Sequence, residues 1–119
     1  MGYTTTFKGS IKIEPPLSWQ EANKINSFCN GRQDERSSTK HPGIWCDYTC
    51  TTTEIKWNGS EKSYDMVQWM EFLIMEFFRP FGRKLDGQME AQGEDFNDRW
   101  LLVVTDNIVS VKRGKTVYE

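Results

Sequence analysis

Histidine and cysteine are scarce in this sequence, which holds one His and three Cys among 119 residues. Because an odd number of cysteines cannot all pair within one chain, we expect Cys29, Cys46 and Cys50 to be buried, reduced thiols. A zinc site is disfavoured because Cys46 and Cys50 lie on one expected strand rather than on a turn. A nucleophile needs a firmly held base, and His41 is the only imidazole. We therefore predict no catalytic residue, no metal site and no cofactor.

Long apolar runs are also missing. The longest, within residues 66–78, is interrupted by Gln68, Glu71 and Glu76, and none approaches the roughly 20 residues that span a bilayer. The N-terminus shows neither the cationic nor the apolar region of a secretory signal. These features predict a cytoplasmic protein with no membrane partner.

The sequence also has no large excess of charge of either sign, because its 15 Lys and Arg residues nearly balance its 17 Asp and Glu residues. A net charge of −2 excludes the strong basic field of a duplex-binding protein and the acidity of a DNA mimic. The glycines are dispersed, so the sequence contains no Walker or dinucleotide fingerprint. Lys8, Lys12 and the basic tail at 112–115 are the remaining route to nucleic acid, on a strand face without aromatic stacking platforms.

Aromatic residues, by contrast, are abundant, with seven Phe, five Trp and four Tyr. A chain of this length buries roughly 65% of the surface that it exposes when unfolded, which is enough for one ordinary core. The sequence therefore predicts a single domain over residues 1–119.

Alternation of apolar and polar residues predicts most of the strands. It runs from Tyr3 to Ile13 and returns over residues 85–92. Residues 44–53 and 54–57 are rich in β-branched and aromatic side chains and predict a hairpin. Residues 99–105 and 108–112 predict a second hairpin, joined at Asp106 and Asn107.

Two helices are expected between these strands, each opened by a capping box. Ser18 and Glu21 form the first box, and Asp65 and Gln68 form the second. The second helix, which we expect to end near residues 79–80, has an unusually narrow polar side. It is either packed on two sides or partly covered by a partner, so Trp69, Phe72 and Phe77 are candidates for self-association in a homodimer.

The order of these elements predicts an α+β fold. We expect a largely antiparallel sheet of about five to six strands with both helices on one face. The first six elements follow the split β-α-β order of ferredoxin-like folds, and a C-terminal hairpin extends them.

Five carboxylates, Asp86, Glu90, Glu94, Asp95 and Asp98, lie in a stretch that contains no Lys or Arg. Such a cluster could bind a divalent cation, supply paired carboxylates for acid–base catalysis, or attract a basic partner. The alternative is a solvated strand face followed by a polar turn.

Three blocks of sequence carry a resemblance to a known family. The chain opens with Gly2-Tyr3 and Phe7-Lys8-Gly9, continues with the block at 55–65 that reads IKWNGSEKSYD, and then has QGED at 92–95 and DRW at 98–100. Together these blocks resemble a family of short, uncharacterised proteins of bacteriophages, prophages and some bacterial genomes. The resemblance covers most of the chain outside residues 32–43, and Asn58 stands where that family has an acidic residue. It implies an accessory protein that acts by stoichiometric binding, but it assigns no catalytic role.

The sequence thus favours a non-enzymatic binding protein that inhibits a host or defence protein or sequesters a small ligand. Two turns hold the candidate binding residues, which exceed what packing requires: Trp57, Glu61, Lys62 and Tyr64 in the first, and Glu94, Asp95 and Asp98 in the second. Helix capping and turn formation are the alternative explanation of both. A second hypothesis is a small carboxylate enzyme, with or without the assistance of a metal, that acts on a nucleotide or phosphate ligand. It requires these carboxylates to converge. A nucleic-acid-binding module is the third.

Overall fold

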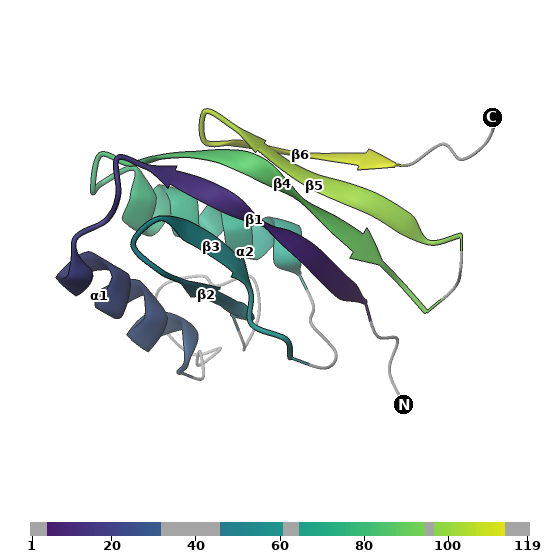
Figure 1. Ribbon diagram of the computed structural model, residues 1–119, viewed down its shortest axis with the longest axis horizontal. Coiled ribbons are helices and arrows are strands. Elements are labelled where there is room, and N and C mark those ends of the chain that lie inside the picture. Colours follow the sequence, from purple (N-terminus) through teal and green to yellow (C-terminus); the bar gives the residue numbers. More distant parts are fainter. Residues whose placement is uncertain (1–4, 32–45, 61–64, 95–96, 114–119) are drawn as a thin grey trace.

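Six antiparallel strands form one open sheet in the computed structural model, which describes residues 5–31, 46–60, 65–94 and 97–113 (Figure 1). The strands are β1 (Thr6–Glu14), β2 (Tyr48–Cys50), β3 (Glu54–Trp57), β4 (Lys84–Gln92), β5 (Arg99–Thr105) and β6 (Ile108–Arg113). Their order across the sheet is β2-β3-β1-β4-β5-β6, so β1 and β4 lie at its centre. Together with two helices, this sheet gives an α+β fold, as predicted from the element order.

The alternation that predicted the strands is visible in their burial. Ile11 and Ile13 of β1 and Leu85 and Met89 of β4 are buried, whereas the residues between them are largely exposed. The predicted terminal hairpin of β5 and β6 is confirmed. Its pairing runs from Trp100 opposite Arg113 to Thr105 opposite Ile108.

β1 and β4 make the longest pairing of the sheet. Nine residue pairs run from Thr6 opposite Gln92 to Glu14 opposite Lys84. Gly87 stands opposite Ile11 in this pair and has a φ of +148°, a conformation that favours glycine. A Cβ at position 87 would lie 3.1 Å from the Ile11 Cα atom and 3.1 Å from the Ser10 carbonyl oxygen. The central pairing therefore depends on the absence of a side chain at this position.

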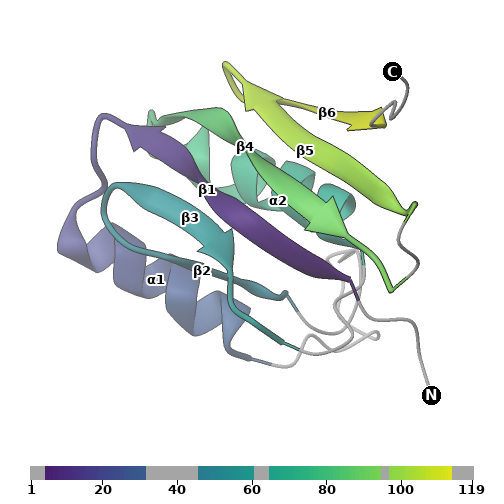
Figure 2. The same ribbon diagram turned by 45° about the vertical axis from the view of Figure 1, so that its right-hand side comes forward.

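Helix α1 (Trp19–Cys29) begins at the predicted capping box. The Ser18 amide donates to Glu21 Oε1 at 2.9 Å, and the Glu21 amide donates to Ser18 Oγ at 3.1 Å. The Asn26 side chain joins α1 to strand β2, because Nδ2 donates to the Cys50 carbonyl at 2.8 Å and Oδ1 accepts from the Cys50 amide at 2.9 Å. Figure 2 shows α1 alongside β2, the edge strand whose backbone the Asn26 side chain binds.

The second helical segment consists of α2 (Met66–Leu73) and the π-helix η1 (Ile74–Phe78). The capping box predicted at its start is wrong, since Asp65 has a left-handed φ of 57° and its side chain makes no cap hydrogen bond. The Asp65 carbonyl instead accepts the first helical bond, from the Trp69 amide at 2.8 Å. The wider π turn inserts one extra residue, which keeps both Ile74 and Phe78 buried.

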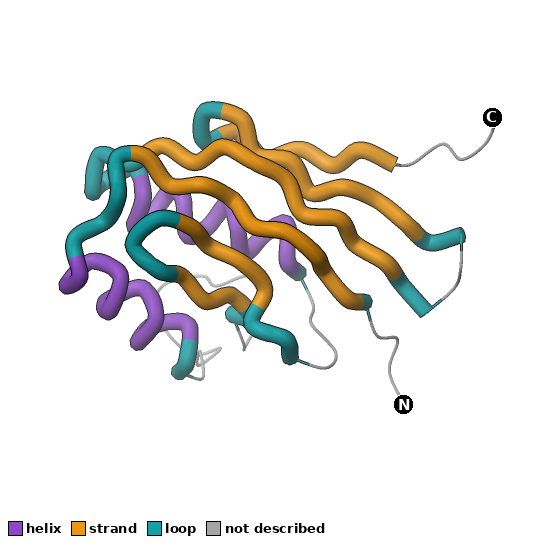
Figure 3. Tube along the Cα trace, viewed as in Figure 1, coloured by secondary structure: helices purple, strands orange, loops and turns teal. Residues whose placement is uncertain are grey.

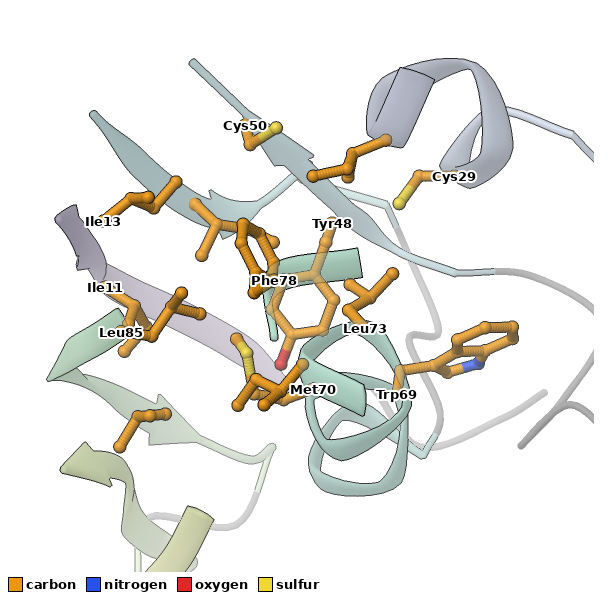
Figure 4. Close-up of a cluster of buried hydrophobic side chains, with 14 of the residues drawn as sticks. Ile11, Ile13, Cys29, Tyr48, Cys50, Trp69, Met70, Leu73, Phe78 and Leu85 are labelled. Atoms are coloured by element: carbon orange, nitrogen blue, oxygen red, sulfur yellow. The ribbon is translucent and has the colours of Figure 1, made fainter. Parts of the chain in front are cut away.

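Tyr48 fastens this helical segment to the sheet. Its hydroxyl donates to the Met66 carbonyl at 2.8 Å, and the side chain is fully buried. Figure 4 shows its ring between β2 and the helix, close to Met70, Leu73 and Phe78. Because the buried hydroxyl has an acceptor, the ring adds apolar contact to the core without an unsatisfied polar group.

Phe28 of α1 joins the two helices through ring contacts. Its ring centroid lies 5.9 Å from that of Trp69, 5.7 Å from Phe72 and 5.3 Å from Phe77. Trp69 is fully buried, which corrects its expected place on a self-association surface. Phe72 and Phe77 are half-buried in the same cluster, so the aromatic side of α2–η1 is used within the chain.

The close approach at Gly87 gives a test of the central pairing. Gly87→Ala is expected to lower the free energy of unfolding by about 2–4 kcal/mol, because it adds a clash with β1 backbone to the strain of positive φ. Gly59→Ala is the matched control, since Gly59 also has a positive φ of +87° but no atom within 4 Å of the added Cβ. We expect it to cost about 1–2 kcal/mol. Urea unfolding of both variants measures the difference, and equal costs would contradict the β1–β4 geometry.

Candidate functional site

The two turns singled out in the sequence lie at the same end of the sheet. Because neighbouring strands run antiparallel, β3 and β4 end where β1 and β5 begin. Figure 3 shows the loop after β3 and the loop between β4 and β5 extending from this end. The candidate site is therefore built from segments that are far apart in the sequence but adjacent in space.

Three aromatic side chains, Phe7, Trp57 and Trp100, form what we call the aromatic rim. The Phe7 ring centroid lies 5.8 Å from that of Trp57 in a tilted contact and 5.7 Å from that of Trp100 in an edge-on contact. Ala91 separates Phe7 from Trp100 in the sheet register, and its small side chain lets the two large rings meet. Phe7 is buried, whereas both tryptophans are half-buried and reach the surface at this end.

The first turn, directly after Trp57, is shaped by its own polar side chains. Asn58 Oδ1 accepts from the Ser60 amide at 3.0 Å and from the Ser60 hydroxyl at 2.7 Å. The Asn58 amide donates to the Asp47 carbonyl at 3.1 Å. Asn58 and its hydrogen bonds to Ser60 thus form a turn beside the aromatic rim.

The second turn joins β4 to β5 and carries the acidic residues. The Gly93 amide donates to the Asp98 carbonyl at 2.8 Å, which closes the turn. Glu94 is exposed and Asp98 is half-buried. Of the predicted binding residues, Trp57, Glu94 and Asp98 therefore share one end of the sheet, while Glu61, Lys62, Tyr64 and Asp95 lie outside the described residues.

Phe7 and Trp100 are missing from the binding residues predicted from sequence. Both belong to segments that the sequence predicts as regular strands, and alternation gives no indication that their rings meet. The signal that brings them together is the register of β1, β4 and β5, which depends on pairing between distant segments.

The acidic cluster of the sequence is divided by the fold. Asp86 and Glu90 share one exposed face of β4, as alternation predicted, but Asp86 Oδ1 accepts from the Asp106 amide at 2.8 Å. Glu90 pairs with Arg99 at 3.2 Å, and Lys8 is its neighbour in the register. Cations from adjacent strands therefore offset a charge that looks unopposed in the sequence.

A hollow of about 410 Å³ lies on this polar face, lined by Ser10, Lys12, Thr53, Glu54, Asp86 and Gly87. The Ser10 hydroxyl donates to Glu54 Oε1 at 2.8 Å. One lysine against two carboxylates does not favour a phosphate, so this hollow gives the nucleotide or phosphate hypothesis no support.

The three cysteines gather in the core near α1 and β2. Cys29 Sγ lies 3.1 Å from Cys46 Sγ, and all three side chains are buried, as predicted. The hydrogen bond with Cys46, and then burial, raises the pKa of Cys29 far above its ordinary value. Burial raises the pKa of Cys50 to about 11. Thiols held neutral in this way are weak nucleophiles at neutral pH.

No protein-family model, curated protein or solved structure matches this chain. Among the helices of residues 5–31, 46–60, 65–94 and 97–113, none combines the length and the apolar character needed to cross a membrane. The same residues contain no group of three or more His, Cys, Asp or Glu side chains placed to hold a metal ion.

The raised pKa of Cys50 predicts how stability depends on pH. The folded state holds this proton more tightly than the unfolded chain, whose thiol titrates near 9.0, so the contribution is complete below pH 9 and is lost through pH 11. A shift from 9.0 to about 11 corresponds to about 2–3 kcal/mol.

Cys50→Ser is the matched variant, because serine keeps a donor for the Ala22 carbonyl but does not titrate in this range. We expect the stability difference between the wild type and Cys50→Ser to shrink between pH 8 and pH 11 in urea unfolding, and a constant difference would contradict the assignment.

Proposed function

We propose that this chain is a non-enzymatic binding protein that engages a partner protein through the aromatic rim and the two turns beside it. In this proposal it is a phage- or prophage-encoded accessory protein of the bacterial cytoplasm that inhibits a host or defence protein. The observation that carries the proposal is the meeting of Trp57 and Trp100 on Phe7 between two polar turns.

Half-buried tryptophans suit a binding surface because the protein already fixes their rings. Trp57 and Trp100 pack against the core on one side and reach the surface on the other. Such a ring loses little conformational entropy when a partner covers it, and Trp is enriched among the residues that dominate binding energy.

The charge beside the rim indicates the character of the partner. Glu94 and Asp98 lie in the turn next to Trp100, and Glu94 is exposed. A partner surface with an apolar centre and a basic border fits this arrangement, since complementary charges accelerate and orient association.

The arrangement of the helices supports a fold assignment that goes with this function. We infer that β1 to β4 with α1 and α2 follow the split β-α-β order and that both helices cover one face, with β5 and β6 as an extension. The shortest extent of the molecule, 21 Å, fits one sheet and one helical layer. Binding at the end of the sheet would then leave its charged face in water.

A comparative pull-down tests the proposal. The full chain is immobilised and exposed to lysate from infected and uninfected bacterial host cells, and retained proteins are quantified by mass spectrometry. We expect Trp57→Ala and Glu94→Lys each to reduce retention of the partner by about tenfold or more, because they remove an anchoring ring and a guiding charge.

Glu76→Lys is the matched control, because it makes the same charge change at an exposed position on η1, away from the aromatic rim. Retention should stay within about twofold of wild type for this variant. Circular dichroism checks the folding of all three variants. A partner retained equally by Trp57→Ala, Glu94→Lys and wild type would show that the rim is not the binding surface, and a small molecule co-purifying in native mass spectrometry would favour ligand sequestration instead.

A further inference from the structure

One edge of the molecule collects most of its exposed apolar surface. Among the described residues, four large apolar side chains stand out as exposed: Trp19 at 73%, Ile108 at 65%, Met75 at 62% and Val111 at 43%. Met75 belongs to η1, and Ile108 and Val111 belong to β6, which packs against α2. Three of the four therefore lie along the same edge, and Met75 and Ile108 lie near the β5–β6 turn, at the opposite end of β5 from Trp100.

A groove of about 310 Å³ runs between the helical segment and the β5–β6 turn at this edge. Its lining residues are Glu71, Ile74, Met75 and Arg79 on the helical side and Asn107, Ile108 and Val109 on the other. Asn107 holds the turn in place, because its Nδ2 donates to the Arg83 carbonyl at 3.0 Å and its Oδ1 accepts from the Leu85 amide at 2.7 Å. The groove is thus preformed and does not depend on an occupant for its shape.

The charges of the groove are arranged symmetrically about its exposed methionine. Glu71 precedes Met75 by four residues, and Arg79 follows it by four. Both charged side chains are exposed, and neither has a salt-bridge partner within the described part of the chain. Glu71 and Arg79 stand about two turns apart on the α2–η1 segment and form no salt bridge with each other.

An acid, an apolar centre and a base in this order form a surface that is complementary to itself. When a second copy is turned by a two-fold axis through Met75, Glu71 of each chain faces Arg79 of the other and the two Met75 side chains meet. A different protein would need a base, an apolar residue and an acid in the matching order on an unrelated surface. A second copy supplies this order by symmetry.

The position of β6 agrees with the same axis. Among the described residues β6 ends the sheet and pairs with β5 alone, so its outer edge offers backbone groups to another strand. A two-fold axis perpendicular to the sheet would place two β6 strands antiparallel and bring the helical segments together on the same side. Strand pairing at the start of β6 and contact between the helical segments are thus compatible with one axis near Met75 and Ile108.

We propose that a second copy of this chain docks on this edge and forms a two-fold homodimer through Glu71, Met75, Arg79 and β6. The surface differs from the one expected from the sequence, which used Trp69, Phe72 and Phe77, because those rings pack within the chain. The dimer leaves the aromatic rim uncovered, so it is independent of the proposed partner binding and would make the protein bivalent.

Charge exchange across the axis tests the proposal. Sedimentation equilibrium of the full chain over micromolar to sub-millimolar concentrations gives the dimer dissociation constant. We expect Glu71→Arg and Arg79→Glu each to raise this constant by about tenfold or more, because each places like charges across the axis. The double variant Glu71→Arg/Arg79→Glu restores opposite charges and should return to within about threefold of wild type.

Glu76→Arg is the control, since Glu76 is exposed on η1 but does not line the groove. It should leave the dissociation constant within about twofold of wild type. Circular dichroism establishes that each variant is folded. A wild-type chain that is monomeric throughout this range would overturn the proposal and leave the groove to a different protein. A dimer that is insensitive to the single variants, or is not restored by the double variant, would also overturn it by placing the interface elsewhere.

Discussion

The burial of the α2–η1 segment is the constraint on which the rest of the structure depends. Its apolar side chains occupy too much of the helix circumference for one contact surface, so different parts of the fold cover different sides. Met70, Leu73 and Phe78 pack into the core with the sheet, and Phe72 and Phe77 pack on Phe28 of α1. The π turn at η1 makes this division possible, because its extra residue shifts the later side chains around the axis.

The polar contacts of the core follow from this burial. Tyr48 reaches from β2 to the Met66 carbonyl, so a short edge strand is fastened to the first turn of the helix. Asn26 joins the opposite side of β2 to α1 through two hydrogen bonds with Cys50. A strand of three residues at the edge of the sheet is thereby held from both helices, and its one thiol, Cys50, lies in a dry environment that keeps it protonated.

Local patterns in the sequence predicted the elements well, whereas the site depends on contacts between distant segments. Alternation located β1, β4 and the terminal hairpin, and Ser18 with Glu21 marked the start of α1. The same capping pattern failed at Asp65, where a left-handed backbone turns the side chain away from the helix. The rim of Phe7, Trp57 and Trp100 could not be predicted, because it is created by strand register. The groove had a local signal in the spacing of Glu71, Met75 and Arg79, but only the packing of Trp69 and Phe72 shows which side of the helix remains exposed.

Methionine oxidation directly distinguishes the buried side of the α2–η1 segment from its exposed side. Met66, Met70 and Met89 are almost fully buried, while Met75 on the same helical segment is 62% exposed. In dilute protein treated with hydrogen peroxide, peptide mass spectrometry should show rapid oxidation of Met75 and slow oxidation of the other three. In concentrated protein, Met75 should become protected as the second copy covers it. Oxidation of Met70 at the same rate as Met75 in dilute protein would contradict the account, because it would show that the core side of the helix is not buried.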